Sequence, residues 1–266
     1  MPIVTVKQGQ LEYLTAEGIG VPHCFTTRHG GVSTGHLSSM NIGLRHGADG
    51  ECVAKNHKIL ARALGFDTKK LVLSHQVHSD IVRKVMSTDA NGIDHHNYPE
   101  CDALITNDPG TTLMVFTADC TPILLHDPVT GAVGAVHAGW RGTAADLAGK
   151  TVRAMTEAYG CSPADIRAAI GPNIGFCCFE TGEEVPNAMI ETYGAAAEEW
   201  IRPSGDKYYV NLKEINALAL RRAGVEHIEI SDACTMCSHS RFWSHRYTRG
   251  LRGSQGAIIV CREVRP

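Results

Sequence analysis

Short apolar runs rich in Val, Ile, Leu and Thr recur along this chain, and four of them follow one another closely between residues 103 and 137. Runs of this length and composition are typical of buried strands, and we expect the close group to form a central meander. The predicted strands are 3–6, 70–73, 81–86, 103–106, 112–117, 122–126, 131–137, 166–170, 225–230 and 257–261.

A few helices are predicted between the strands. Residues 51–64 place an apolar stripe on one face and stop at Gly65, and residues 143–159 do the same and stop at Gly160. A third helix, 211–223, begins at a plausible N-cap residue, and a fourth is expected near 183–193. Because strands outnumber helices and do not alternate with them, we predict an α+β fold with mixed sheets. No repeat, low-complexity tract or linker divides the chain, so we expect a single domain, 1–266.

Charge and cysteine usage exclude several classes of protein. A formal net charge of -3 and a pI near 6.5 give no general attraction to nucleic acid or to an anionic membrane. The sequence has no apolar stretch long enough to span a bilayer, and MPIVTVKQGQ does not resemble a signal peptide. We therefore expect a cytoplasmic protein whose ten cysteines are reduced, some of them free to bind metal.

Three segments carry soft-metal ligands at turns or strand ends: HQVHS at 75–79, TADCTP at 117–122 and HAGWRG at 137–142. Cys120, His137 and one histidine of the first segment suit Zn(II), and three protein ligands leave the fourth tetrahedral position open, as in catalytic sites. The residues alone do not choose between His75 and His78. Without the other two segments, the sequence around Cys120 is also typical of a cysteine buried in an apolar core.

Two glycine-rich segments are candidate anion sites. HAGWRG leads into the predicted helix at 143, where unpaired backbone N–H groups, Arg141 and Gly142 could hold a phosphate. FTTRHGGVS at 25–33 places Arg28 beside two glycines. The alternative for both segments is an ordinary turn, with Trp140 in the core and Arg141 in solvent.

The remaining cysteines give a weaker signal. HIEISDACTMC at 227–237 superficially resembles the signature of zinc nucleoside deaminases, but the gap between Glu229 and Cys234 is too short, so we reject it. Cys234 and Cys237 are a redox pair, a structural half-site with His239, or simply packed thiols. Cys177 and Cys178 would diverge in an extended segment, so we do not expect them to share a metal.

Taken together, FTTRHGGVS, NIGL at 41–44, HQVHS, TADCTP, HAGWRG, GPNIGFCCFE, CTMC and FWSHR closely resemble the YfiH-like family over nearly the whole chain. Members of that family have been labelled multicopper polyphenol oxidase, laccase domain-containing protein, peptidoglycan editing factor and zinc-dependent purine nucleoside phosphorylase. The resemblance implies stacked mixed sheets with outer helices, and the metal ligands His78, Cys120 and His137. The sequence departs from many relatives at Arg45-His46 and at LRGSQGA, 251–257.

The resemblance also implies phosphorolysis of adenosine, inosine and methylthioadenosine, with adenosine deamination as a secondary activity. Phosphorolysis needs a bound phosphate, which the zinc site, Arg28 and the GWRG turn could hold, and a hydrogen-bond donor for the departing purine. Deamination needs a carboxylate that shuttles protons, for which Asp119 and Glu180 are candidates.

Three rival functions remain open. A multicopper laccase needs His-x-His pairs, and no two of the fourteen histidines are two positions apart, although copper could replace zinc and oxidise phenols weakly. A cysteine hydrolase acting on a peptidoglycan precursor would use Cys120 as nucleophile and His137 as base. A non-enzymatic binding protein would use the metal structurally.

Overall fold

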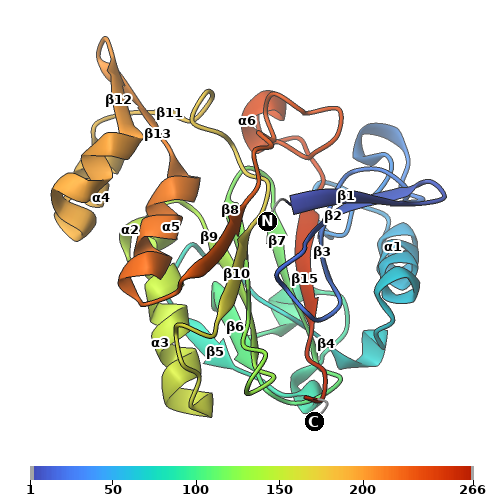
Figure 1. Cartoon of the computed structure of the whole chain (residues 1–266). Coiled ribbons are helices and arrows are strands. Elements are labelled where there is room, and N and C mark those ends of the chain that lie inside the picture. The colour runs from blue at the N-terminus through green and yellow to red at the C-terminus, as the bar shows by residue number, and fades with distance from the viewer. Residues whose placement is uncertain (1–2, 265–266) are drawn as a thin grey trace.

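Residues 3–264, which the computed structural model describes, form two stacked six-stranded sheets and a small three-stranded sheet (Figure 1). The first sheet has the order β1-β2-β3-β15-β7-β4 and the second has the order β14-β10-β8-β9-β6-β5. Both are mixed, since β4 runs parallel to β7 and β5 runs parallel to β6 while most other pairs are antiparallel. The predicted α+β fold with stacked mixed sheets is confirmed.

The bounds of the elements are close to those expected from the apolar runs. The strands are β1 Ile3–Gln8, β2 Leu11–Ala16, β3 His23–Thr26, β4 Leu71–Leu73, β5 Val82–Lys84, β6 Ala103–Thr106, β7 Thr112–Thr117, β8 Thr121–His126, β9 Val133–Ala138, β10 Arg167–Ile170, β11 Glu180–Thr181, β12 Ile201–Ser204, β13 Lys207–Val210, β14 His227–Ile230 and β15 Gln255–Val260. The α-helices are α1 Gly50–Leu64, α2 Trp140–Ala144, α3 Leu147–Tyr159, α4 Glu184–Tyr193, α5 Leu212–Arg222 and α6 His245–Thr248.

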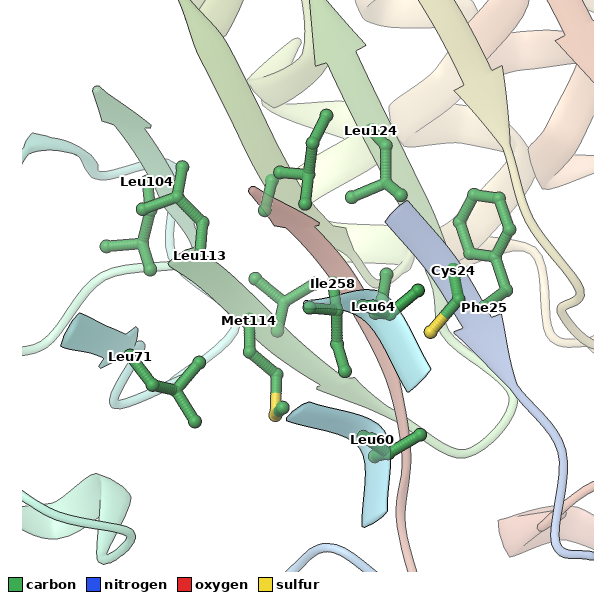
Figure 2. Packing of buried hydrophobic residues seen from close by; sticks show 14 of the residues in the cluster. Cys24, Phe25, Leu60, Leu64, Leu71, Leu104, Leu113, Met114, Leu124 and Ile258 are labelled. Carbon is green, nitrogen blue, oxygen red and sulfur yellow. The ribbon is translucent and has the colours of Figure 1, made fainter. Parts of the chain in front are cut away.

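Alternate residues of the second sheet face two different apolar cores. Leu104 and Leu124 point toward the first sheet, where Figure 2 shows Leu104 beside Leu113. Their neighbours Ile105 and Ile123 belong to a separate cluster with helices α3 and α5. This alternation is the two-residue period of a strand buried on both faces. The second sheet is therefore an inner layer of the molecule.

Helices cover the outer sides of the sandwich, as expected. Helix α1 lies beside the first sheet, and α3 and α5 lie against the second (Figure 1). Leu60 and Leu64 of α1 belong to the same cluster as Met114 of β7 (Figure 2). None of the helices in the described range 3–264 has the length and apolar character needed to span a membrane.

The central meander predicted for residues 103–137 is wrong for one of its four strands, β7. β6, β8 and β9 are neighbours in the second sheet, but β7 lies in the first sheet between β15 and β4. β7 and β8 are both buried along almost their whole length, because each is an inner strand covered on both faces. Continuous apolar runs of this kind do not reveal which sheet a strand joins. The chain therefore crosses between the sheets just before β8.

The helix predicted over 143–159 is two helices. Helix α2 ends at Ala144, and Asp146 adopts a left-handed conformation with φ of 57° before α3 begins. That conformation interrupts a right-handed helix, and the apolar stripe that predicted the helix, Ala148, Val152, Met155 and Tyr159, lies entirely within α3. Strands β2, β3, β11, β12 and β13 were not predicted.

Candidate metal centre

The predicted metal ligands meet where the chain crosses between the two sheets. His78 lies in the connection from β4 in the first sheet to β5 in the second, and Cys120 lies in the connection from β7 to β8. His137 is near the end of β9, where it pairs with Pro122 of β8. Because it has the same parity as Val133 and Ala135, its side chain faces the space between the sheets. Segments far apart in sequence thus converge at one end of the sandwich.

The three donor atoms are close enough to bind one ion. One donor atom from each of His78, Cys120 and His137 lies within 4.8 Å of the other two. His78 Nε2 and Cys120 Sγ are 3.8 Å apart. A tetrahedral ion with Zn–N and Zn–S bonds of about 2.0 and 2.3 Å needs a separation of about 3.5 Å between these atoms. The residues therefore fit zinc, and since His78 is exposed and all three ligands line the cleft, a bound ion would be accessible from the cleft.

Asp102 holds two of these ligands in place from behind. It is fully buried immediately before β6, and its Oδ1 accepts a hydrogen bond of 2.8 Å from His137 Nδ1. That bond leaves Nε2 of His137 free for a metal. The same carboxylate accepts the backbone N–H groups of Val77, His78 and Ser79 and the Ser79 hydroxyl. One side chain thus fixes both the His137 ring and the turn that carries His78.

Backbone conformation at the site is unusual. His78 has φ of 61° and Asp119, next to Cys120, has φ of 88°. Residues other than glycine are uncommon in this region, and such strain is concentrated at functional sites. The hydrogen bonds from the 77–79 backbone to Asp102 hold His78 in this conformation.

The charges of the three groups favour metal binding. Burial opposes an ionised thiol, but His137 and His78 outweigh it and lower the pKa of Cys120 to about 6. Burial also opposes a charged His137, but Cys120 and Asp102 raise the pKa of its imidazole to about 9. Burial would raise the pKa of Asp102, yet His137 and Ser79 hold it at about 2. The pocket therefore carries thiolate and carboxylate charge, which a divalent cation in place of the His137 proton would neutralise.

Gly139 is required by the packing of the ligands. A Cβ at this position would lie 2.8 Å from Cδ2 of His78 and 3.3 Å from Sγ of Cys120. The His78 ring also lies against Cys120 Sγ and the His137 ring, so its withdrawal would separate the three ligands. The glycine after β9 therefore makes room for the metal ligands themselves.

The ligands line a cleft with about 540 Å³ of empty space, counting its opening to solvent. The enclosed part has a volume of only about 80 Å³, below the range of about 300–1,000 Å³ typical of small-molecule sites, so a bound small molecule would extend into the open mouth of the cleft. Two arginines, Arg45 and Arg252, lie on its wall with the aromatic ring of Phe116. Gln76 also lines it, but its amide is held by the Phe116 backbone, to which it donates at 2.7 Å and from which it accepts at 2.7 Å. The cleft thus combines a metal site, cationic groups and an aromatic surface.

His95 completes the wall of the cleft. Its Nε2 lies 3.3 Å from Nη2 of Arg45. Since a guanidinium only donates, His95 Nε2 accepts this bond and its proton is on Nδ1. Burial, together with the positive charges of His96 and Arg45, lowers the pKa of His95 to about 4. At neutral pH it is therefore an uncharged hydrogen-bond donor.

The anion-binding residues predicted from sequence lie outside this wall. Within the described range, Arg28, Arg141 and Gly142 are not among the residues that line the cleft. The Arg28 guanidinium stacks on Trp243 at 3.9 Å and donates to the carbonyls of His239 and Ser38. Arg141 is exposed and stacks on Trp140, while Gly142 is buried in the short helix α2.

The two carboxylates considered for proton transfer differ in their surroundings. Asp119 is buried beside Cys120 and accepts hydrogen bonds from the Thr235 and Ser244 hydroxyls and from the Arg246 backbone N–H. Glu180 is exposed on β11 and accepts from the Tyr209 hydroxyl. Asp119 therefore links the strand end that carries Cys120 to the C-terminal segment.

Sequence reasoning missed four residues of the site: Asp102, Gly139, Arg45 and Arg252. Asp102 looks like the first residue of a buried strand, and a buried carboxylate there was a signal that it needs a partner. Gly139 lies inside the HAGWRG motif, but a glycine is needed there because of contacts with His78 and Cys120, which are distant in sequence. Arg45 and Arg252 come from loops about 200 residues apart and share no local pattern.

The chain is similar to known proteins in both sequence and structure. The sequence model of the family described as "Multi-copper polyphenol oxidoreductase laccase" matches residues 22–262. The chain is 39% identical over 244 residues to "Purine nucleoside phosphorylase YlmD" of Geobacillus stearothermophilus, covering 90% of this chain and 89% of the relative. It is 35% identical over 227 residues to "Purine nucleoside phosphorylase YfiH" of Escherichia coli (strain K12), covering 85% and 88%. The crystal structure of YlmD from Geobacillus stearothermophilus matches with a TM-score of 0.92 and 36% identity, over 98% of this chain and 100% of that chain.

Proposed function

Since the chain belongs to the family described as multi-copper polyphenol oxidoreductase laccase, in which the similar proteins above are named purine nucleoside phosphorylases, we propose that it is a zinc-dependent purine nucleoside phosphorylase. Residues 1–266 act as one catalytic domain in this proposal. Its substrates are adenosine, inosine and methylthioadenosine together with phosphate, and adenosine deamination is a secondary activity.

The observation that carries the proposal is the composition of the cleft. His78, Cys120 and His137 lie on the same wall as Arg45 and Arg252, so three metal-ligating side chains and two guanidinium groups surround one space. Guanidinium groups bind phosphate through paired N–H donors, which also fix its orientation. When bound, zinc would act as a Lewis acid that holds an oxygen of the substrates.

Phosphorolysis requires phosphate to be held against C1′ of the ribose. We assign this task first to Arg45 and Arg252, because both line the cleft. Arg28, Arg141 and the Gly142 backbone are retained as further candidates. Holding phosphate beside C1′ lowers the entropic part of the barrier, since the two reactants meet already oriented.

The departing purine needs a surface and a hydrogen-bond donor. Phe116 is partly exposed in the cleft, so its ring can stack on the base. His95 Nδ1 carries a proton and has no partner among the described residues, but the atom is buried, so the ring would have to turn before it could donate to the base. A donor in this position stabilises negative charge as it develops on the base.

Deamination requires a carboxylate that moves protons between water and the base. We assign this role to Asp119, which is adjacent to Cys120, with Glu180 as the alternative. Within the described range, neither carboxylate is among the residues that line the cleft, so a water molecule would have to carry the proton between the carboxylate and the base.

One experiment with two measurements tests the proposal. Zinc and copper per chain are measured by mass spectrometry in protein purified without added metal. The same protein is incubated with adenosine, with and without phosphate, and the products are separated by chromatography. Adenine with ribose 1-phosphate indicates phosphorolysis, and inosine indicates deamination. We expect His78→Ala to lose both the ion of this site and both products. Absence of any product from the wild-type protein would overturn the proposal.

A cysteine hydrolase is a second candidate, because Asp102, His137 and Cys120 form a chain resembling a Cys-His-Asp triad. The lowered pKa of Cys120 would suit a nucleophile as well as a metal ligand. A thiol-directed inhibitor separates the two. In the phosphorylase proposal it labels Cys120 only after zinc removal and inhibits only by displacing metal, whereas a hydrolase would be active and labelled without metal. Copper loading followed by a phenol oxidation assay tests the polyphenol oxidase alternative.

A further inference from the structure

A second group of cysteines lies outside the cleft. Cys177 and Cys178 were expected to diverge, but residues 176–178 form a tight turn in which the N–H groups of Cys178 and Phe179 both donate to the Gly175 carbonyl. In a turn, neighbouring side chains no longer point to opposite faces as they do in a strand. The turn directs both thiols toward Cys234 and Cys237, so the expected divergence of their side chains is wrong.

The four sulfur atoms form one compact group. All of them lie within 4.8 Å of one another. Cys237 Sγ is 3.5 Å from Cys177 Sγ and 3.4 Å from Cys178 Sγ. Four thiolates bound to zinc at about 2.3 Å in a tetrahedron would be about 3.8 Å apart. The arrangement therefore needs only small shifts to bind an ion at its centre.

Backbone N–H groups point at the most buried sulfur of the group. Cys234 Sγ accepts from the Gly175 N–H at 3.1 Å and from the Cys237 N–H at 3.5 Å. Such bonds stabilise a thiolate, which is the form that binds metal. The bonds come from both segments of the cluster, so the backbone is already arranged around a charged sulfur.

A buried cation supports the same segment. Lys213 of α5 is 7% exposed, and its Nζ donates to the carbonyls of Ser231 and Ala233, immediately before Cys234. Zinc bound by four thiolates has a net charge of -2, so a fixed ammonium nearby lowers its cost of burial.

We propose that Cys177, Cys178, Cys234 and Cys237 form a closed structural zinc site that joins the 173–178 turn to the 231–237 segment. Four thiolates fill the coordination sphere, which distinguishes a structural site from the open catalytic one. Thiolate ligands also select against calcium and magnesium. This inference is independent of the reaction proposed above.

The site is connected to the catalytic cleft through hydrogen bonds. Thr235, between the two cysteines of the second segment, donates to Asp119 and its backbone N–H donates to the Asn173 carbonyl. The Ile174 N–H donates to the Asp119 carbonyl. Both joined segments therefore contact the residue that precedes Cys120. We expect loss of the structural zinc to weaken zinc binding at His78, Cys120 and His137 as well.

Metal stoichiometry tests the proposal without any activity assay. In protein purified under reducing conditions, we expect two zinc ions per chain in the wild type and one in His78→Ala. Cys237→Ser should bind one ion or fewer, and Cys52→Ser, which changes a partly exposed free cysteine on α1, should retain two. Equal zinc content in Cys237→Ser and the wild type would overturn the proposal.

Two measurements on protein with an intact cluster guard against a variant that fails to fold. Cobalt(II)-loaded His78→Ala should show the visible bands of a tetrahedral tetrathiolate ion. In native wild-type protein, Cys177 and Cys237, although exposed, should resist alkylation until a strong chelator is added, while Cys52 reacts. Absence of the cobalt bands, chelator-independent alkylation of these two cysteines, or a disulfide within the cluster in reduced protein would each contradict a zinc site. Failure of phosphorolysis alone would leave these results unchanged.

Discussion

Asp102 Oδ1 and His137 Nδ1 are joined by a hydrogen bond of 2.8 Å, and the same carboxylate accepts three consecutive backbone N–H groups from the turn that carries His78. This relationship makes one buried acid responsible for the orientation of two ligands that are 59 positions apart in the sequence. The ligand geometry therefore depends on β6 as much as on the two segments that hold the histidines.

The first prediction concerns Asp102→Asn. The amide cannot accept from all of these donors, so we expect zinc affinity at the His78 site to fall about 10- to 100-fold, as is usual when such supporting groups are changed. Competition with a chromophoric chelator measures the affinity. Asp108→Asn is the matched control, because Asp108 also accepts a backbone N–H and a hydroxyl, from Ser87 and Thr111, but lies beyond the other end of β6. Unchanged affinity in Asp102→Asn would contradict a positioning role.

The second prediction concerns Gly139→Ala. The added Cβ would lie 2.8 Å from His78 and 3.3 Å from Cys120, so one ligand must move. We expect at least a tenfold loss of zinc affinity with only a small change in the midpoint of urea unfolding of the metal-free protein. Gly50→Ala, at the exposed start of α1, has nothing closer than 3.9 Å and should bind zinc normally. Normal zinc binding by Gly139→Ala would show that the ligands can rearrange.

Features that depend on neighbouring residues in the sequence were predicted correctly, and features that depend on contacts across the fold were not. Strands such as β6 and β7 were predicted with their correct bounds, because an apolar run is a local signal. Their assignment to one meander failed, since both are buried on two faces and only packing decides between sheets. Cys120 and His137 were selected from their motifs. The choice of His78 over His75 came from the family resemblance, because the contact with Asp102 that holds it is not local.

The third prediction ranks the arginines. Arg252→Ala and Arg45→Ala should each raise the KM for phosphate about 10- to 100-fold, which corresponds to loss of a charge-assisted hydrogen bond worth about 1.5–3 kcal/mol. Zinc content should not change. Arg28→Ala and Arg141→Ala should raise this KM less, because neither side chain lines the cleft. Phosphorolysis rates at varied phosphate measure the four values. A larger effect at Arg28 or Arg141 would return the phosphate site to the segments selected from sequence.

The fourth prediction concerns pH and stability at His126. Its side chain is buried, and burial lowers its pKa to about 4 despite Asp127, with His23 and Arg167 adding positive charge nearby. In the unfolded chain the pKa is about 6.5, so the unfolded state binds more protons between pH 6.5 and 4. This contribution to stability is complete above pH 6.5 and is lost as the pH falls, by up to about 1.4 kcal/mol per pH unit.

Urea unfolding at several pH values with saturating zinc tests this expectation. The unfolding free energy of the wild type minus that of His126→Gln should decrease as the pH falls from 7 to 4. Zinc release affects both proteins and cancels in the difference. His227→Gln, at an exposed position on β14, should show no such trend. A constant difference between the wild type and His126→Gln would contradict the lowered pKa.

The last prediction separates two roles of Asp119. Asparagine has the same shape, its oxygen can accept the Arg246 N–H, and the hydroxyls of Thr235 and Ser244 can rotate to suit an amide. We therefore expect Asp119→Asn to retain zinc and phosphorolysis within severalfold. It should lose deamination by about 10²- to 10⁴-fold, the usual contribution of a general acid or base. Asp119→Ala, which removes all three bonds, should lower both activities. Inosine formation by Asp119→Asn at the wild-type rate would reduce Asp119 to a positioning residue and leave Glu180 as the candidate shuttle.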